Sequence, residues 1–221
     1  KFAIFSVNDW KDSITELKRK KVKKKDFPKD TLVIFNIGNQ QIEKIPNVKS
    51  YKIPEKWSGI VAYYLAEATP KKGKAKKSKN KTKKNKAKKV SNKNGYHLII
   101  RQLESGIQDT LQFVTKHTIS KEGKVITYST TGIKGKIKSG VYKYDVNTRT
   151  SNLIFESHYK TKYPQIGISD SGDRIGFVVD ADSTKSLIKK PNLYAWKKGQ
   201  TTANQIVVSE SNTSKLLVSG D

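Results

Sequence analysis

The amino-acid sequence predicts an all-β fold, a β-propeller assembled from four-stranded antiparallel blades. Three observations predict it. One stretch contains four short β-type runs, strands of the same kind recur in the same order, and the recurrence approaches the period of roughly 40 to 50 residues that is typical of propeller repeats. We expect an incomplete arc of about four blades.

The clearest module spans residues 117–156. Its four runs are rich in Val, Ile, Tyr, Phe and Thr, and they are separated by Gly, Asn, Asp and Ser. β-Branched and aromatic side chains suit a pleated, half-buried surface, and the separating residues suit turns. The stretch therefore predicts four strands, at His117–Ser120, Val125–Ser129, Val141–Val146 and Ser151–Phe155.

The third strand of this module recurs along the chain. Each copy has a polar residue at its fifth position and a turn directly after it. The copies begin 66, 43 and 52 residues apart. Removing about 25 residues of one Lys-rich insertion brings the first interval into the range of propeller repeats. The four copies are Leu32–Ile37, Leu98–Leu103, Val141–Val146 and Leu193–Lys198.

The second strand also recurs, at Phe2–Phe5, Val61–Tyr64, Ile126–Ser129 and Ile175–Val178. Its second position is small in every copy, which is expected where neighbouring sheets approach closely. The residues at that position are Ala3, Ala62, Thr127 and Gly176. A Ser-x-x-Gly turn precedes the last two copies, at Ser120–Gly123 and Ser169–Gly172.

These repeats predict a single partial propeller domain over residues 1–221. We expect blade one at 1–47, blade two at 48–115 with a disordered Lys-rich loop at 69–94, blade three at 116–160 and blade four at 161–210. Residues 211–221 are strand-like, and either start a further blade, which we favour, or close the ring beside the first blade. The alternative fold is a β-sandwich or another all-β domain whose strands are similar by accident.

Composition excludes some classes of chemistry. The sequence contains no Cys, so a disulfide framework and thiolate chemistry are not available to it. No run approaches the 18 or so consecutive apolar residues of a membrane span. Residues 12–21 show a short helical period that includes Ile14 and Leu17.

The formal net charge of +26 is concentrated in two runs. Residues Lys18–Lys29 and Lys71–Lys93 together hold 21 of the 45 basic residues, and the rest of the chain has 24 basic and 18 acidic residues. Both runs are predicted between the second and third strands of a module. Outside them the charge balance is that of an ordinary surface.

The longer run is a candidate contact for polyanions, because clustered lysines release counterions from phosphates or acidic polymers. It lacks the interleaved aromatic or Arg side chains that stack on bases, so a solvated insertion is the favoured interpretation and nucleic acid is not an expected partner. The candidate contact residues are Lys71, Lys72, Lys76, Lys77, Lys83, Lys84, Lys88 and Lys89.

No catalytic or metal motif is complete in this segment. His97, His117 and His158 have no metal-type spacing. Asp180–Thr184 lacks the Gly and the terminal Glu of a calcium loop, and Gly167–Ser171 lacks the last Gly of a nucleophile elbow. We therefore expect no catalytic residue, no metal site and no cofactor.

With its modules aligned, the chain resembles the N-terminal propeller region of bacterial prolyl oligopeptidase-family serine peptidases of the Bacteroidetes type. The similarity spans nearly the whole chain, and its motifs are shared with related dipeptidyl-peptidase and TolB-like propellers. The residues that carry it are Lys29–Ile37, Lys49–Trp57, Val61–Tyr63, Asn94–Tyr96, Ser139–Asp145, Asp180–Lys185 and Asn192–Trp196.

The resemblance implies a parent serine peptidase in which a propeller of about seven or eight blades caps a C-terminal α/β-hydrolase domain. The cap admits peptide substrates and excludes folded proteins, while the Ser, Asp and His of the hydrolase domain carry out acyl transfer. None of those three residues can be assigned in this sequence. The resemblance also favours a periplasmic or secreted location.

Two other functions stay open from the sequence. The chain could be a stand-alone propeller that binds a protein partner as a scaffold, or a polyanion-binding module that acts through its lysine-rich loops. A Gly-x-Ser-x-Gly elbow encoded downstream would favour the peptidase cap over both.

Overall fold

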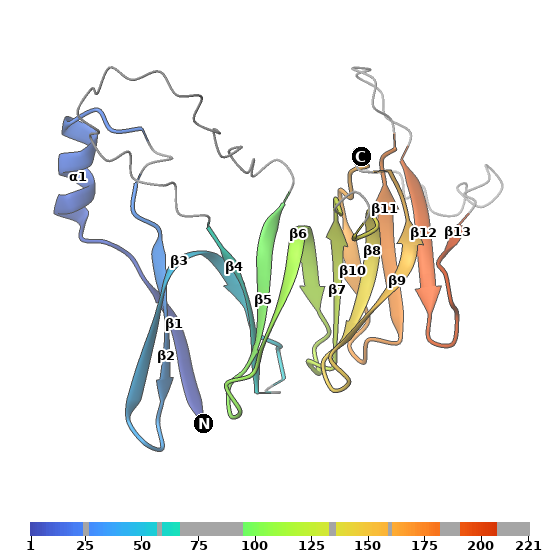
Figure 1. Ribbon diagram of the computed structural model, residues 1–221, viewed down its shortest axis with the longest axis horizontal. Helices are drawn as coiled ribbons and strands as arrows, with labels where there is room; N and C mark the ends of the chain where they lie inside the picture. The colour runs from blue at the N-terminus through green and yellow to red at the C-terminus, as the bar shows by residue number, and fades with distance from the viewer. Residues whose placement is uncertain are drawn as a thin grey trace, which may run out of the picture. The chain divides into compact units, whose positions relative to one another are not determined.

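The computed structural model describes residues 1–23, 27–56, 59–66, 95–132, 136–158, 161–181 and 191–206. Within these ranges it contains thirteen β-strands and one α-helix (Figure 1). The chain divides into two units, one of Lys1–Lys52 with Val61–Leu111 and one of Ile53–Ile60 with Gln112–Asp221.

The first unit is an antiparallel sheet whose strands follow chain order. Along the chain, the helix comes between the first two strands. The start of the long strand β6 also belongs to this unit. The elements are β1 (Phe2–Val7), α1 (Lys11–Arg19), β2 (Asp30–Asn36), β3 (Gln41–Lys52), β4 (Ile60–Leu65), β5 (Tyr96–Gln102) and β6 (Gln108–Ile119).

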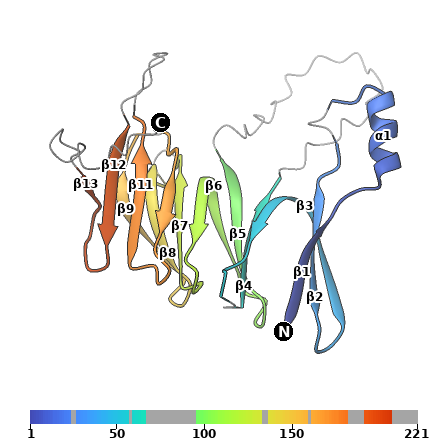
Figure 2. The same ribbon diagram turned by 180° about the vertical axis from the view of Figure 1, so that it is seen from behind.

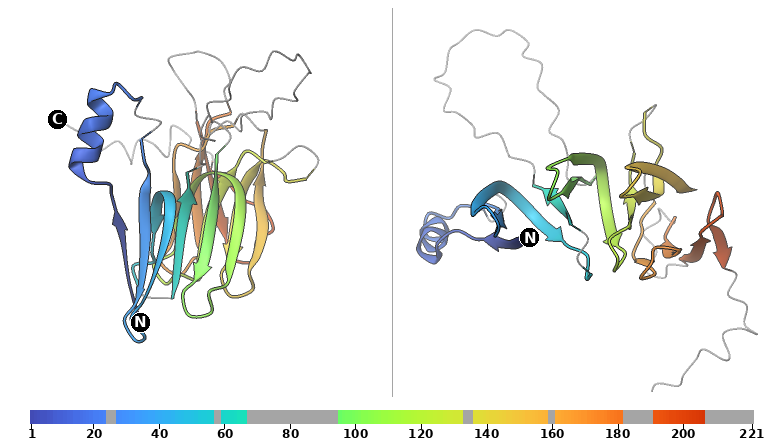
Figure 3. Two further views of the ribbon diagram at one scale, coloured as in Figure 1. Left: turned by 60° about the vertical axis from the view of Figure 1, so that its left-hand side comes forward. Right: turned by 90° about the horizontal axis from the view of Figure 1, so that it is seen from below.

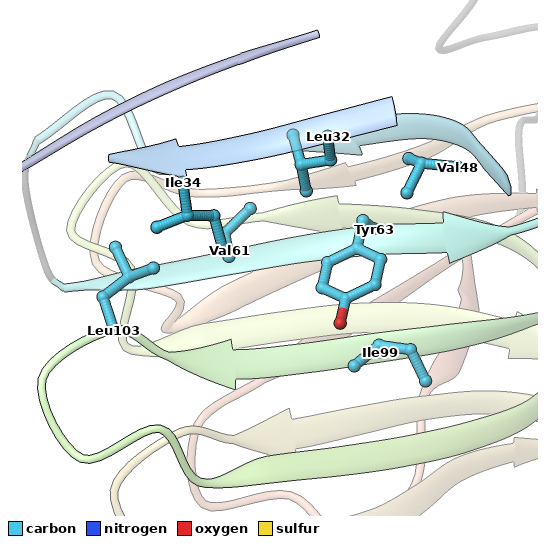
Figure 4. Packing of buried hydrophobic residues seen from close by; sticks show 7 residues of the cluster. All are labelled: Leu32, Ile34, Val48, Val61, Tyr63, Ile99 and Leu103. Carbon is cyan, nitrogen blue, oxygen red and sulfur yellow. The ribbon is translucent and has the colours of Figure 1, made fainter. Parts of the chain in front are cut away.

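The core of the first unit lies on one face of this sheet. Alternate side chains of β2 and β4 point to the same face, as the twofold period of a strand requires. Figure 4 shows the buried cluster that they form with residues from β3, β5 and the turn after β5. Its members are Leu32, Ile34, Val48, Val61, Tyr63, Ile99 and Leu103.

The second unit contains two sheets. The first consists of the end of β6, β7 (Val125–Thr130), β8 (Gly140–Asp145) and β9 (Thr150–Glu156); the second consists of β10 (Ile166–Ile168), β11 (Arg174–Val179), β12 (Asn192–Lys197) and β13 (Asn204–Ile206). Both follow chain order, and β11, β12 and β13 run side by side in Figure 2. One core joins the two sheets, made of Val141, Ile154, Tyr163, Ile175, Phe177, Val179 and Trp196.

Strands β3 and β6 are both bent (Figure 3). Each is twelve residues long and contains one residue in the left-handed region, Asn47 with φ of 60° and Phe113 with φ of 55°. A left-handed non-glycine residue is uncommon, and its use at both places marks a repeated junction. The next residues, Val48 and Val114, are both buried.

The hydrogen bonding around this junction repeats as well. The amide of Ala66, just after β4, donates to Asn47 O at 2.7 Å, and the amide of Thr131, just after β7, donates to Phe113 O at 3.3 Å. In both strands a bulge follows directly, where the pairing register shifts by one residue. The first half of β3 pairs with β2 and its second half with β4, while β6 lies beside β5 and its second half pairs with β7.

The two predicted Ser-x-x-Gly turns have the same geometry. In turns 120–123 and 169–172 the glycine amide donates to the serine carbonyl at 2.9 and 3.0 Å. The serine Oγ accepts a hydrogen bond from Val125 N in the first turn, at 3.2 Å, and from Arg174 N in the second, at 3.0 Å. The glycines have φ of 71° and 83°, which is why glycine is required.

The predicted alignment of the third strand is confirmed for three of its four copies, because the residue after β2, β8 and β12 makes the same backbone bond. Ile37, Val146 and Lys198 donate to Lys1 O, Lys124 O and Asp173 O. The predicted alignment of the second strand is wrong by one residue in β1. Phe2, Val125 and Arg174 are equivalent, because each pairs with the fifth position of the following third strand. Ile4, and not Ala3, is therefore the residue equivalent to Thr127 and Gly176.

The first position of the third strand is buried in three of its four copies. Leu32, Leu98 and Val141 are each 0% exposed, whereas Leu193 is 37% exposed. Leu32 and Val141 belong to the two cores, and Leu193 belongs to neither. The side chain type is therefore repeated even where its burial is not.

The predicted helical period at 12–21 is confirmed by α1. The first basic run lies between β1 and β2, and the second lies between β4 and β5, as expected from the strand order. In the part of the chain that the structure describes, no helix has the length and apolar character needed to cross a membrane.

Candidate functional site

The predicted polyanion contacts all fall in residues 67–94, outside the described residues. They are Lys71, Lys72, Lys76, Lys77, Lys83, Lys84, Lys88 and Lys89. Their role stays a prediction from the sequence.

The basic side chains in the described part of the first run are exposed. Five of the six residues at 18–23 are basic, and only Lys20 forms an ion pair with a described residue, to Glu16 at 3.2 Å. Exposed pairs of this kind contribute little to stability. Four positive charges on this short segment are thus available to an anionic surface.

The histidines do not converge. His97 lies on β5, His117 on β6 and His158 after β9. Among the described residues, no three His, Asp or Glu side chains are placed to hold a metal ion. His117 is 7% exposed, so its ring is part of the packing of its unit.

The imperfect nucleophile elbow has a structural role. Ser169 begins a turn, and its Oγ accepts the amide of Arg174. An elbow serine instead presents its hydroxyl at a sharp turn between strand and helix. Ser169 lies between two strands, so its hydroxyl stabilises a hairpin.

The bulge in β3 holds a lysine against two aromatic rings. Lys49 Nζ lies 3.7 Å from the ring centroid of Tyr96 and 6.0 Å from that of Tyr64. The two rings are 5.8 Å apart, and burial raises the pKa of the Tyr64 hydroxyl. The cation–π contact fixes the ammonium group on one side of the first unit.

An Arg–Glu pair crosses the same sheet. The Arg101 guanidinium on β5 donates through both Nη atoms to the Glu43 carboxylate on β3. The Arg101 side chain is 13% exposed and that of Glu43 46%. Burial raises the pKa of Tyr63 on β4, and Arg101 partly offsets that rise. These residues are 58 positions apart in sequence, and no motif marks them.

In the second unit, a lysine in the bent strand is also held in place. Lys116 Nζ donates to the carbonyl of Pro164, which precedes β10. Lys116 has the same place in the repeat as Ser50, because both follow the bulge. The Pro164 carbonyl, just before β10, therefore holds the Lys116 ammonium group in place.

Ion pairs connect the turns of the second unit. Lys121 Nζ lies 3.3 Å from Asp170 and 3.7 Å from Glu55. The hydrogen bond and charge of Asp170, with a smaller contribution from Glu55, raise the pKa of Lys121. Glu122 N donates to Asp170 O at 3.2 Å, so the backbone reinforces the same contact. These charges therefore hold neighbouring turns together.

An open groove of about 470 Å³ runs over the sheet β10–β13. Three small residues and one Asn are paired in register across its floor, namely Gly167, Gly176, Ala195 and Asn204. Positions without large side chains let another segment approach the backbone closely.

Comparison with known proteins gives evidence on the fold. No protein-family model matches the chain, and no curated protein matches it. Solved structures do match. One is a structure from a study of two prolyl endopeptidases. The alignment covers 82% of this chain and 26% of that chain, at 10% sequence identity and a TM-score of 0.50.

Two further solved structures are similar. The β-propeller domain of the Trilobed protease from Pyrococcus furiosus has 14% identity, a TM-score of 0.47 and coverage of 80% of this chain and 49% of its own. The acylaminoacyl peptidase of Pyrococcus horikoshii has 14% identity, a TM-score of 0.43 and coverage of 69% and 24%. The chain spans about half or less of each of these structures.

Three observations indicate the same fold. They are the repeated strand order, the repeated junctions at Asn47 and Phe113, and the match to the prolyl endopeptidase structure. The all-β class predicted from the sequence is confirmed, and the fold of this chain is that of a β-propeller built from antiparallel four-stranded blades.

Proposed function

We propose that this chain is the non-catalytic propeller segment of a prolyl oligopeptidase-like serine peptidase, and that it limits access of peptide substrates to a hydrolase domain of the same polypeptide. The observation that carries the proposal is the sequence resemblance, which follows the repeated module through its strands. In this proposal, one blade ends and the next begins after Asn47 and again near Phe113, where the two long strands bend.

The geometry of the bent strands supports a size-limiting role. In a propeller, the first strand of each blade lines the central channel. With the proposed blade boundaries, those strands are the second halves of β3 and β6, and β10. A channel wall that selects by size must hold its shape, and both Lys49 and Lys116 are fixed by contacts to their own unit.

The chemistry would come from elsewhere in the polypeptide. The hydroxyl of Ser169 is used in a turn, and Ser120 repeats that use. Acyl transfer needs a serine activated by a histidine and an oxyanion hole at its side. The segment would contribute exclusion and positioning, while a triad in the hydrolase domain would cleave the peptide bond.

The test begins with the complete coding sequence and the complete protein. We expect a Gly-x-Ser-x-Gly elbow downstream, and hydrolysis of a short proline-containing peptide by the complete protein. The same peptide sequence inside a folded protein should resist cleavage, and residues 1–221 alone should be inactive. A complete reading frame without an elbow, or equal cleavage of the folded protein, would contradict the proposal.

A variant pair tests the channel more sharply. Lys52 lies in the second half of β3, and Lys44 lies in the first half of the same strand. Lys52→Gln should change kcat/KM for acidic peptides relative to neutral ones, because Lys52 lies on the half of β3 proposed to line the channel. Lys44→Gln is the matched control and should leave that ratio unchanged. Equal effects of the two variants would count against a channel at this strand.

Polyanion binding is the second candidate, and one observation favours it: 21 of the 45 basic residues lie in two runs. Affinity for heparin should then fall steeply with salt, and deletion of residues 71–93 should remove most of it. If that deletion leaves the affinity unchanged, the lysine-rich loop is not a polyanion site.

A further inference from the structure

Helix α1 contributes no side chain to the core of its unit. None of its residues is buried. Trp10, which precedes the helix, is 83% exposed, the largest exposed fraction among the described large apolar residues. Val7, at the end of β1, is 47% exposed. An exposed Trp beside an uncovered helix has no role in the core of the protein.

The helix carries its apolar and acidic residues on different sides. Trp10, Ile14 and Leu17 follow one another at intervals of four and three residues, which places them within about 60° around the helix axis. Ile14 and Leu17 are partly exposed. Asp12 and Glu16 lie on the opposite side by the same geometry. The apolar stripe is therefore free of acidic neighbours.

Basic residues border the stripe and follow it. Lys11 and Lys18 lie beside the stripe by the helical period. Lys18 and Arg19 form the last turn, and Lys20, Lys21 and Lys23 come directly after it. Apart from Lys20, none of these forms an ion pair with a described residue.

We propose that α1 is a docking helix for an anionic lipid surface. Trp10, Ile14 and Leu17 enter the boundary between headgroups and acyl chains, and the basic residues at 18–23 contact lipid phosphates. A tryptophan is favoured at this boundary because its ring is apolar and its N–H is polar. The helix lies on the surface and does not cross it, as expected of a short basic amphipathic segment.

Charge and apolar surface together select this partner. A nucleic acid would satisfy the lysines and could stack on Trp10, but it offers no apolar surface to Ile14 and Leu17. A lipid surface satisfies both groups at once, and neither signal alone gives stable binding. The inference does not depend on the proposed peptidase function, because it uses no residue of the proposed channel.

The experiment is co-sedimentation of the full chain with vesicles of phosphatidylcholine alone, or with about a third of phosphatidylglycerol. Binding should be confined to the anionic vesicles. Trp10→Gln should lower the partition coefficient about tenfold, by loss of apolar burial. Lys18→Gln with Arg19→Gln should lower it about 25-fold, at about fivefold for each charge. Ile107→Gln, which changes another exposed apolar residue, is the control and should have no effect.

A second variant separates the helix from the longer lysine run. Deletion of residues 71–93 should leave the Trp10 dependence intact, and emission from Trp10 should shift to shorter wavelength on binding, seen as the difference from Trp10→Phe. Two outcomes would overturn the proposal. One is vesicle binding that is insensitive to Trp10→Gln. The other is binding that Trp10→Gln weakens equally for DNA and for vesicles.

Discussion

Replacement of Gly172 tests the packing between the two sheets of the second unit. This glycine has φ of +83°, and a Cβ atom there would lie 2.6 Å from Val125 Cγ2 and 2.7 Å from Val125 Cβ. Ordinary carbon contacts are about 3.5 to 4.0 Å, so one side must move by about 1 Å. Gly172→Ala should cost about 1 kcal/mol for the left-handed backbone and about 1 to 3 kcal/mol for overpacking.

Gly199 is a matched control in the same unit. It has φ of +96°, and a Cβ atom added there would meet no heavy atom of the described residues within 4 Å. Gly199→Ala should therefore carry only the backbone cost, about 1 kcal/mol. Asn tolerates the left-handed region, so Gly199→Asn should be nearly neutral while Gly172→Asn stays destabilising.

The assay is urea unfolding followed by tryptophan fluorescence, to which Trp196 in the core of this unit contributes. The quantity compared is the loss of unfolding free energy in each alanine variant. The packing argument predicts a larger loss at Gly172 by about 1 to 3 kcal/mol. Equal losses at the two glycines would refute it.

Three further predictions follow from individual contacts. Ser120→Ala should cost about 1 to 2 kcal/mol in urea unfolding and Ser169→Ala less, because Ser120 is fully buried and its loss leaves a buried amide unpaired. Glu43→Gln should destabilise the first unit more than Arg101→Met does, because it leaves the mostly buried Arg101 guanidinium without its counter-charge, whereas Arg101→Met leaves the more exposed Glu43 to water; a larger loss in Arg101→Met would contradict that reasoning. Burial raises the pKa of Tyr128 to about 12 from 10.0, so its stabilising contribution is intact below pH 10 and is lost as the pH rises through about 12. Between these values wild type should lose about 1.4 kcal/mol per pH unit more than Tyr128→Phe, and parallel pH profiles would contradict this.

The strands could be predicted because their signals are local. Val, Ile, Tyr and Thr alternate with turn residues, and the Ser-x-x-Gly turns need glycine for a positive φ. The short helix was also marked by its own period at Ile14 and Leu17. The predicted alignment is wrong in β1, where the local signal is weaker. The small side chain of Ala3 favours it for the repeated position, but the strand pairing puts its neighbour Ile4 there.

The long-range features carried no sequence signal. Asn47 and Phe113 share a left-handed backbone but no side-chain chemistry, so the repeated junction could not be predicted from residue types. The pair of Glu43 and Arg101 depends on strand register across β4, which fixes which side chains meet. The exposure of Leu193 depends on what covers its sheet, and that is also not a property of the strand itself.

An experimental structure of the full chain is the most direct test of the repeated module. It should show Asn47 and Phe113 with positive φ, their carbonyls accepting the amides of Ala66 and Thr131, and strands in chain order within each sheet. A β-sandwich, with strand order departing from chain order and with those two residues in unrelated settings, would contradict the account.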